Sequence, residues 1–155
     1  MHKNIGHLLK SAKNLVHVRE ELIKLFKVTK NGNAKIGYVA GVMYSEGPEF
    51  AKTNLDRLIS HAEKLRKLHG FPMFTAVDVF PHEVYNNLEE WKLSFEEREE
   101  KVRQFWREIL KSGHVTDIFM TPRWEKSKGA LDEHKTARQL GLKIHYVEDT
   151  HDMYT

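Results

Sequence analysis

The chain has 155 residues, of which 40% are hydrophobic and 30% charged, and its formal net charge is +3 at pH 7. This length fits a single domain over residues 1–155 with a sizeable core, and the composition is that of a soluble globular protein. The absence of cysteine from the sequence excludes disulfides and thiolate metal sites, and no apolar run is long enough to cross a membrane or to act as a secretory signal.

We therefore expect a cytoplasmic protein without a membrane partner. Basic residues are interleaved with acidic ones, a pattern that fits a small anionic ligand better than a nucleic acid polymer. Ten histidines are present, but no pair has the spacing of metal ligands on a convincing helix, so no metal site is predicted. The chain has no GxGxxG or P-loop motif, and no cofactor is predicted.

Residues 1–34 are predicted to be a helical extension that precedes the first strand. An amphipathic helix is expected over residues 7–26, where apolar side chains recur at helical spacing. This helix either covers an edge of the sheet, as unprotected edges require, or contacts another subunit. Asn31-Gly32-Asn33 then predicts a turn.

The first strand is predicted at residues 35–40 (KIGYVA), and a helix at residues 48–69. Gly41 follows the strand and would allow a ligand to approach the backbone closely at the strand's carboxyl end. Tyr38 and Tyr44 are candidate base or sugar contacts, although Tyr38 fits equally well as a core residue with a hydrogen-bonded hydroxyl.

The second strand is predicted at residues 71–80, and Asp78 is its one charged residue. A carboxylate at the end of a buried strand points to the ligand crevice, although Asp78 could equally form a turn before Pro81. A loop at residues 81–87 and a long charged helical region at residues 88–112 follow. The length and aromatic content of that region favour it as the surface of a homodimer or higher homo-oligomer.

The last part of the chain predicts a strand at residues 115–120, a loop at 122–129, a helix from the N-cap Ser127 to Leu140, and a strand at 142–147. A strand, crossover helix and parallel strand form a βαβ unit. The predicted fold is therefore an α/β, Rossmann-like or flavodoxin-like three-layer sandwich, with a mostly parallel sheet of four to five strands.

Glu133 interrupts the apolar face of that last helix. Ala130, Glu133 and Ala137 lie at positions i, i+3 and i+7, a face that should pack against the sheet. A partly buried carboxylate near a helix N-terminus and a strand-end loop is a candidate nucleophile or general base. Glu133 could instead be a helix-dipole residue at the margin of the packed face, or pair with Arg138 or Lys128.

The loop and helix start carry the motif W-x-x-S-x-G-A-x-x-E, from Trp124 to Glu133. With Asp117 in the preceding strand, this motif resembles the nucleoside 2-deoxyribosyltransferase-like superfamily, in particular a short branch with the same loop. It is also similar to the nucleoside 5′-monophosphate N-glycosidases, which share S-x-G-x-x-x-E. Ala40-Gly41 matches the small-residue loop of that superfamily, and Val42 replaces its common proline.

The resemblance implies that Glu133 attacks the anomeric carbon of a nucleoside or nucleotide. It also implies that Ser127 and Gly129 hold the 5′ end or phosphate, helped by Arg123 or Lys128, and that residues 81–87 cover the substrate.

A second acid should orient the sugar or protonate the departing base. Asp117 matches one family position, but Glu108 is out of register at the other, and Asp78 is the remaining candidate. The predicted function is hydrolysis or transfer at an N-glycosidic bond. A non-catalytic nucleotide-binding or signalling module on the same scaffold is the alternative, and a structural dimer built on the two long helices is a third.

Overall fold

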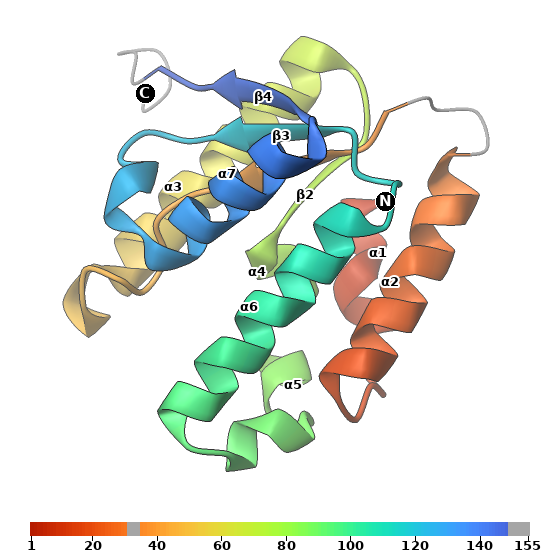
Figure 1. Ribbon diagram of the computed structural model, residues 1–155, viewed down its shortest axis with the longest axis vertical. Helices are drawn as coiled ribbons and strands as arrows, with labels where there is room; N and C mark the ends of the chain where they lie inside the picture. Colours follow the sequence, from red (N-terminus) through yellow and green to blue (C-terminus); the bar gives the residue numbers. More distant parts are fainter. Residues whose placement is uncertain (31–34, 149–155) are drawn as a thin grey trace.

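The computed structural model describes residues 1–30 and 35–148, apart from the side chains of residues 82 and 83. The turn predicted at Asn31-Gly32-Asn33 and the end of the polar tail lie outside the described residues. Four parallel strands form one sheet in the order β2-β1-β3-β4 (Figure 1). Their bounds are Gly37–Ala40 for β1, Met73–Thr75 for β2, Asp117–Met120 for β3 and Lys143–Tyr146 for β4.

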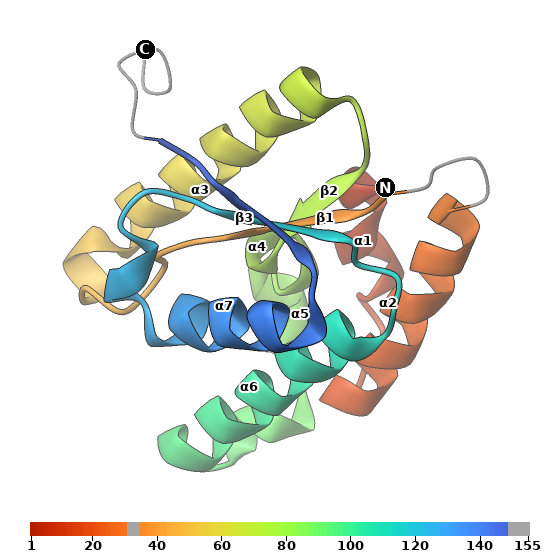
Figure 2. The ribbon, with the colours of Figure 1, turned by 45° about the horizontal axis from the view of Figure 1, so that its top comes forward.

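The helices before β3 are α1 (His2–Leu8), α2 (Leu15–Lys30), α3 (Pro48–His69), α4 (Ala76–Val79), α5 (His82–Tyr85), η1 (Glu89–Lys92) and α6 (Phe95–Lys111). After β3 come the short η2 (Trp124–Lys126) and α7 (Lys128–Leu140). Helix α3 covers one face of the sheet, and α6 and α7 lie on the other (Figure 2). The predicted three-layer α/β fold of the Rossmann or flavodoxin type is confirmed.

Side chains of successive strand residues alternate between these two faces. Tyr38 pairs in register with Phe74 on β2 and Ile118 on β3, and all three belong to the core on the α6 and α7 side. Val39 and Phe119 belong to the smaller core beneath α3. This alternation follows from the two-residue period of a strand, and it decides which face of the sheet each polar strand residue reaches.

The N-terminal extension consists of two helices instead of the single helix predicted at residues 7–26. Asn14 starts the second helix, because its side-chain oxygen accepts a hydrogen bond from the backbone N–H of His17 at 2.9 Å. The break lets α1 contact β2 and α4 while α2 packs along α6. Both helices contribute buried residues to the core on this face of the sheet.

The strand predicted at residues 71–80 is limited to β2, and the chain turns into α4 at Ala76. Thr75 caps this helix and forms a reciprocal capping box with Asp78. The predicted long helix at 88–112 is also interrupted, because Ser94 caps α6 by accepting from the N–H of Glu97 at 3.2 Å. Both interruptions follow the capping pattern S/T-x-x-acid, a local signal that outweighs the apolar run around it.

The described helices include none with the length and apolar character that a membrane span requires.

Candidate functional site

Glu133 is a buried carboxyl on the inner face of α7, and 8% of the residue is exposed. Ser127 begins the helix, since its hydroxyl accepts from the N–H of Ala130 at 3.1 Å. This cap fixes the helical register that turns Ala130, Glu133 and Ala137 inward, as the sequence predicts. The hydroxyl of Tyr38 on β1 lies 3.0 Å from both carboxyl oxygens of Glu133.

Burial controls the ionisation of this pair. It raises the pKa of Glu133 from 4.5 to about 8, although the hydrogen bond from Tyr38 acts in the opposite direction. Burial also raises the pKa of Tyr38 far above its ordinary value, and the neighbouring Glu133 raises it further. At neutral pH the carboxyl therefore keeps its proton in the ligand-free protein.

Aromatic side chains separate this pair from solvent. The Tyr38 ring packs against Trp106 with centroids 4.8 Å apart. Tyr85 of α5 stacks on Phe80 at 5.6 Å, and it lies close enough to Tyr38 to affect the pKa of that hydroxyl. The side chain of Tyr44, which is 53% exposed, hydrogen-bonds to Tyr85. These contacts thus connect the partly exposed Tyr44, through Tyr85, with the buried Tyr38 beside Glu133.

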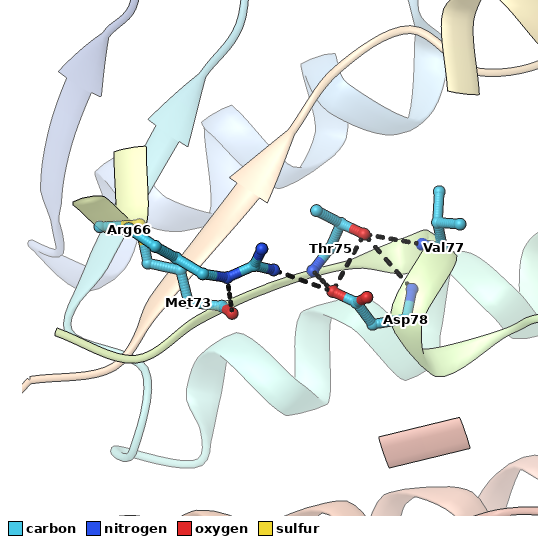
Figure 3. A network of polar contacts seen from close by, with 5 residues as sticks. All are labelled: Arg66, Met73, Thr75, Val77 and Asp78. Atoms are coloured by element: carbon cyan, nitrogen blue, oxygen red, sulfur yellow. Dashed lines mark hydrogen bonds and ion pairs between the residues drawn. The ribbon is translucent and has the colours of Figure 1, made fainter. Parts of the chain in front are cut away.

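Asp78, a predicted catalytic acid, holds α4 and its junction with β2. Its Oδ2 accepts a hydrogen bond of 2.8 Å from the backbone N–H of Thr75 and pairs with Arg66 of α3 at 3.4 Å (Figure 3). Arg66 also donates to the carbonyl of Met73 at 3.0 Å. These contacts engage the Asp78 carboxylate with Arg66 of α3 and with the backbone at the end of β2.

Asp117, the other predicted acid, is the first residue of β3 and therefore lies at the amino end of the sheet. Its carboxylate pairs with His145 of β4 at 2.7 Å and accepts from the Thr116 hydroxyl at 2.6 Å. Burial opposes its ionisation, but these two hydrogen bonds prevail and lower its pKa. Because Asp117 alternates with Ile118, it faces α3, on the opposite side of the sheet from Glu133.

The predicted substrate-binding residues around the N-terminus of α7 do not form one cluster. Lys128 and Gly129 are exposed in the first turn of α7. The Trp124 ring instead packs against His134 at 4.3 Å and lies 6.2 Å from Tyr146 of β4.

Arg123 and Gly41 belong to the loops on the α3 side. The Arg123 guanidinium donates to Glu46 and Asn54, each at 3.1 Å. A Cβ at Gly41 would overlap the Thr121 hydroxyl, so this glycine admits a neighbouring side chain. A small cavity lies between the same loops, and Glu133 is not among its lining residues.

Tyr85, Glu46 and Asn54 are members of these clusters that the sequence does not predict. Tyr85 lies in the segment expected to cover the substrate, and the structure gives that segment a short helix, α5, instead of the predicted loop. Its contact with Tyr44 joins residues 41 positions apart, as numbered in the sequence, and pairings at that separation leave no local sequence signal.

Within residues 1–30 and 35–148, no three histidine, aspartate or glutamate side chains come together as metal ligands. Comparisons of the chain with protein-family models, with curated proteins and with solved structures found no match. The class of the protein is therefore defined by its fold, a parallel α/β sheet with a buried carboxyl on the helix after β3.

Proposed function

We propose that the protein is a cytoplasmic enzyme that cleaves or transfers the N-glycosidic bond of a nucleoside or nucleoside 5′-monophosphate through Glu133. The observation that carries the proposal is the buried Glu133 carboxyl, with both oxygens within hydrogen-bond distance of the Tyr38 hydroxyl. A hydrophobic side chain would fill this core position at lower free energy, since a buried carboxyl is costly. The loop motif from Trp124 to Glu133 supports the same chemistry.

N-glycosidic cleavage passes through a transition state that resembles an oxocarbenium ion, so a carboxylate beside the anomeric carbon stabilises the developing positive charge. Attack by Glu133 on the anomeric carbon forms a glycosyl-enzyme ester as the bond from that carbon to the base nitrogen breaks, and the departing base takes a proton from water. Water or a second base then attacks the anomeric carbon and returns the Glu133 carboxylate. Tyr38 is a positioning residue in this scheme, because its hydroxyl holds the carboxyl in one orientation.

The pKa of about 8 at Glu133 sets the expected pH dependence. Only the ionised carboxylate can attack, so kcat/KM should rise about tenfold per pH unit below that pKa and level off above it. In this scheme a substrate reaches Glu133 past the surrounding aromatic side chains, and the rings of Tyr85 and Tyr44 offer faces on which a nucleobase can stack.

The test is release of free base from a panel of nucleosides and nucleoside 5′-monophosphates, measured by chromatography. Wild type should release base from at least one member, and Glu133→Gln should abolish release. Glu125→Gln is the matched control, because Glu125 is an exposed acid in η2, just before α7. If no member yields free base, the catalytic proposal is wrong.

A non-catalytic nucleotide-binding module remains the second candidate, and the positions of Asp78 and Asp117 favour it. Both carboxylates are engaged by other residues on the α3 side, so neither supplies Glu133 with a second acid. This function predicts that a nucleotide raises the melting temperature while no base is released.

Assembly as a homodimer through the α6 region is part of the proposal. Phe105 and Trp106 of α6 are buried in the chain's own core, whereas Phe95 is 62% exposed at the start of the helix. Light scattering should give the mass of two chains, and Phe95→Ser should shift the equilibrium toward the monomer. A wild-type mass of one chain would contradict this part.

A further inference from the structure

Parallel α/β sheets bind ligands between two neighbouring strands whose connections leave in opposite directions. In this sheet those strands are β1 and β3. These strands are neighbours, but the helices that follow them, α3 and α7, lie on opposite faces of the sheet (Figure 2). The two exit loops therefore diverge and leave a crevice at the carboxyl ends of the strands. A cavity of about 20 Å³ lies between these loops, and Val42 and residues 121–123 line it.

The α3 wall of this cavity is polar. Asn54, Arg57 and His61 line it from successive turns of the helix. Asn54 and His61 are only 3% and 2% exposed. Asn54 is hydrogen-bonded there, because its side-chain nitrogen donates to the Met43 carbonyl at 3.4 Å and to the Glu46 carboxylate at 3.0 Å. A helix face that packs against a sheet is normally apolar, so three polar side chains at one cavity set this end of α3 apart from a purely packing surface.

Arg123 closes the cavity from the β3 side. Within residues 1–30 and 35–148 it is the one non-glycine residue with a positive φ, at 67°. This conformation costs a side-chain-bearing residue about 1–2 kcal/mol, and such strained residues cluster at ligand sites. Its guanidinium is held by the Glu46 carboxylate at 3.1 Å and the Asn54 side-chain oxygen at 3.1 Å.

The Glu46 carboxylate shows where an oxyanion can lie against Arg123. Arg57 is an exposed cation at the mouth of the same cavity. Arg57 and Arg123 therefore line the same cavity, and a planar guanidinium can donate several hydrogen bonds to a phosphate. The cavity of about 20 Å³ has room for one ligand oxygen, since a single water needs about 10–15 Å³, and the rest of the anion would lie between the two arginines.

We propose that this cavity is a phosphate-binding site in which Arg123 and Arg57 bind the anion and the Glu46 carboxylate is displaced. The site lies on the α3 side of the sheet, whereas Tyr38 and Glu133 face α7. The inference is thus independent of the chemistry proposed for Glu133. The bound phosphate is either a free anion or the phosphate group of a nucleotide.

Thermal unfolding of the full chain with inorganic phosphate, against chloride at matched ionic strength, tests the proposal. Phosphate should raise the melting temperature saturably in wild type. Arg57→Gln should weaken the phosphate affinity about tenfold, the effect of losing one charge-assisted hydrogen bond. Arg123→Gly should weaken it as much, and glycine accepts the positive φ, so this variant should fold.

Two further variants make the test specific. Glu46→Gln should strengthen phosphate binding, because the competing carboxylate is gone. Lys52→Gln is the matched control, since Lys52 is an exposed cation of α3 that pairs with Asp56 at 3.0 Å, and it should bind phosphate like wild type. Glu133→Gln should also retain phosphate binding, which separates this site from the proposed catalytic one.

A nucleoside 5′-monophosphate, compared with the unphosphorylated nucleoside, distinguishes the two sources of phosphate. Stabilisation by the monophosphate that depends on Arg57 and Arg123 indicates a nucleotide phosphate, and stabilisation by inorganic phosphate alone indicates a free anion. The proposal is overturned if phosphate has no more effect than chloride on both wild type and Glu46→Gln. It is also overturned if both arginine variants retain the wild-type affinity.

Discussion

Replacement of Glu133 by glutamine should make the protein less stable than wild type at low pH and more stable than wild type at high pH. The pKa of Glu133 is raised from 4.5 to about 8 by burial, so between these values the folded protein binds the proton more tightly than the unfolded chain. Stability of the wild type therefore falls as pH rises through this range and levels off above it. At about 1.4 kcal/mol per pH unit, the full loss is about 5 kcal/mol.

Glutamine carries no titrating proton, so this loss is absent from the variant. Its carbonyl still accepts the Tyr38 hydrogen bond, but its amide lacks a buried acceptor, a constant cost of about 1–3 kcal/mol. We expect Glu133→Gln to be less stable than wild type by that amount at about pH 4, below the ordinary pKa of the carboxyl. Near pH 9 the variant should be more stable than wild type by about 2–4 kcal/mol, the difference between the two effects.

Urea unfolding at a series of pH values measures the free energy of unfolding of wild type and of Glu133→Gln. The quantity of interest is the difference between the two free energies of unfolding, because the histidines contribute equally to both and cancel. Glu125→Gln, which replaces an exposed acid, should show no such pH-dependent difference. A difference for Glu133→Gln that stays constant from about pH 5 to pH 9 would refute the raised pKa and the proton held by Glu133 at neutral pH.

Tyr38→Phe should raise the pKa of Glu133 further, because the lost hydrogen bond lowers it, and the fall in stability should move to higher pH in the same urea series. Asp117→Asn should cost about 1–3 kcal/mol at neutral pH. That cost should disappear as pH falls through the lowered pKa of the Asp117 carboxyl, and unchanged base release would agree with its position at the amino end of β3. Gly41→Ala should cost about 1–3 kcal/mol in calorimetry, since the added methyl overlaps the Thr121 hydroxyl; a neutral substitution would show that this hydroxyl moves aside freely.

Glu133 and Asp117 show why one part of the candidate site could be predicted and another could not. Glu133 is on the buried face of α7 because its spacing from Ala130 and Ala137 is local and helical, and the sequence displays that spacing directly. Asp117 lies in a strand of the sheet, and the side of the sheet to which its carboxylate points depends on the register of β3. A shift of one residue would turn its carboxylate to the other side of the sheet.

The sequence alone determined the elements whose signals lie within a few residues. Pro48 at the first turn and Gly70 after the last residue define α3 as predicted, and Ser127 and Gly141 define α7 in the same way. Both glycines have a φ of 72°, the left-handed conformation that ends a helix. The parallel α/β class follows from the order of these elements along the chain.

Only the tertiary structure decided which side chains meet. Tyr38 and Glu133 are 95 residues apart, and Arg123 reaches Glu46 across 77. Such pairs depend on strand order and register, which arise when the whole core packs, and no short motif encodes them. The tertiary fold therefore placed Glu133 beside Tyr38 on one face of the sheet and Arg123 beside a separate cavity on the other.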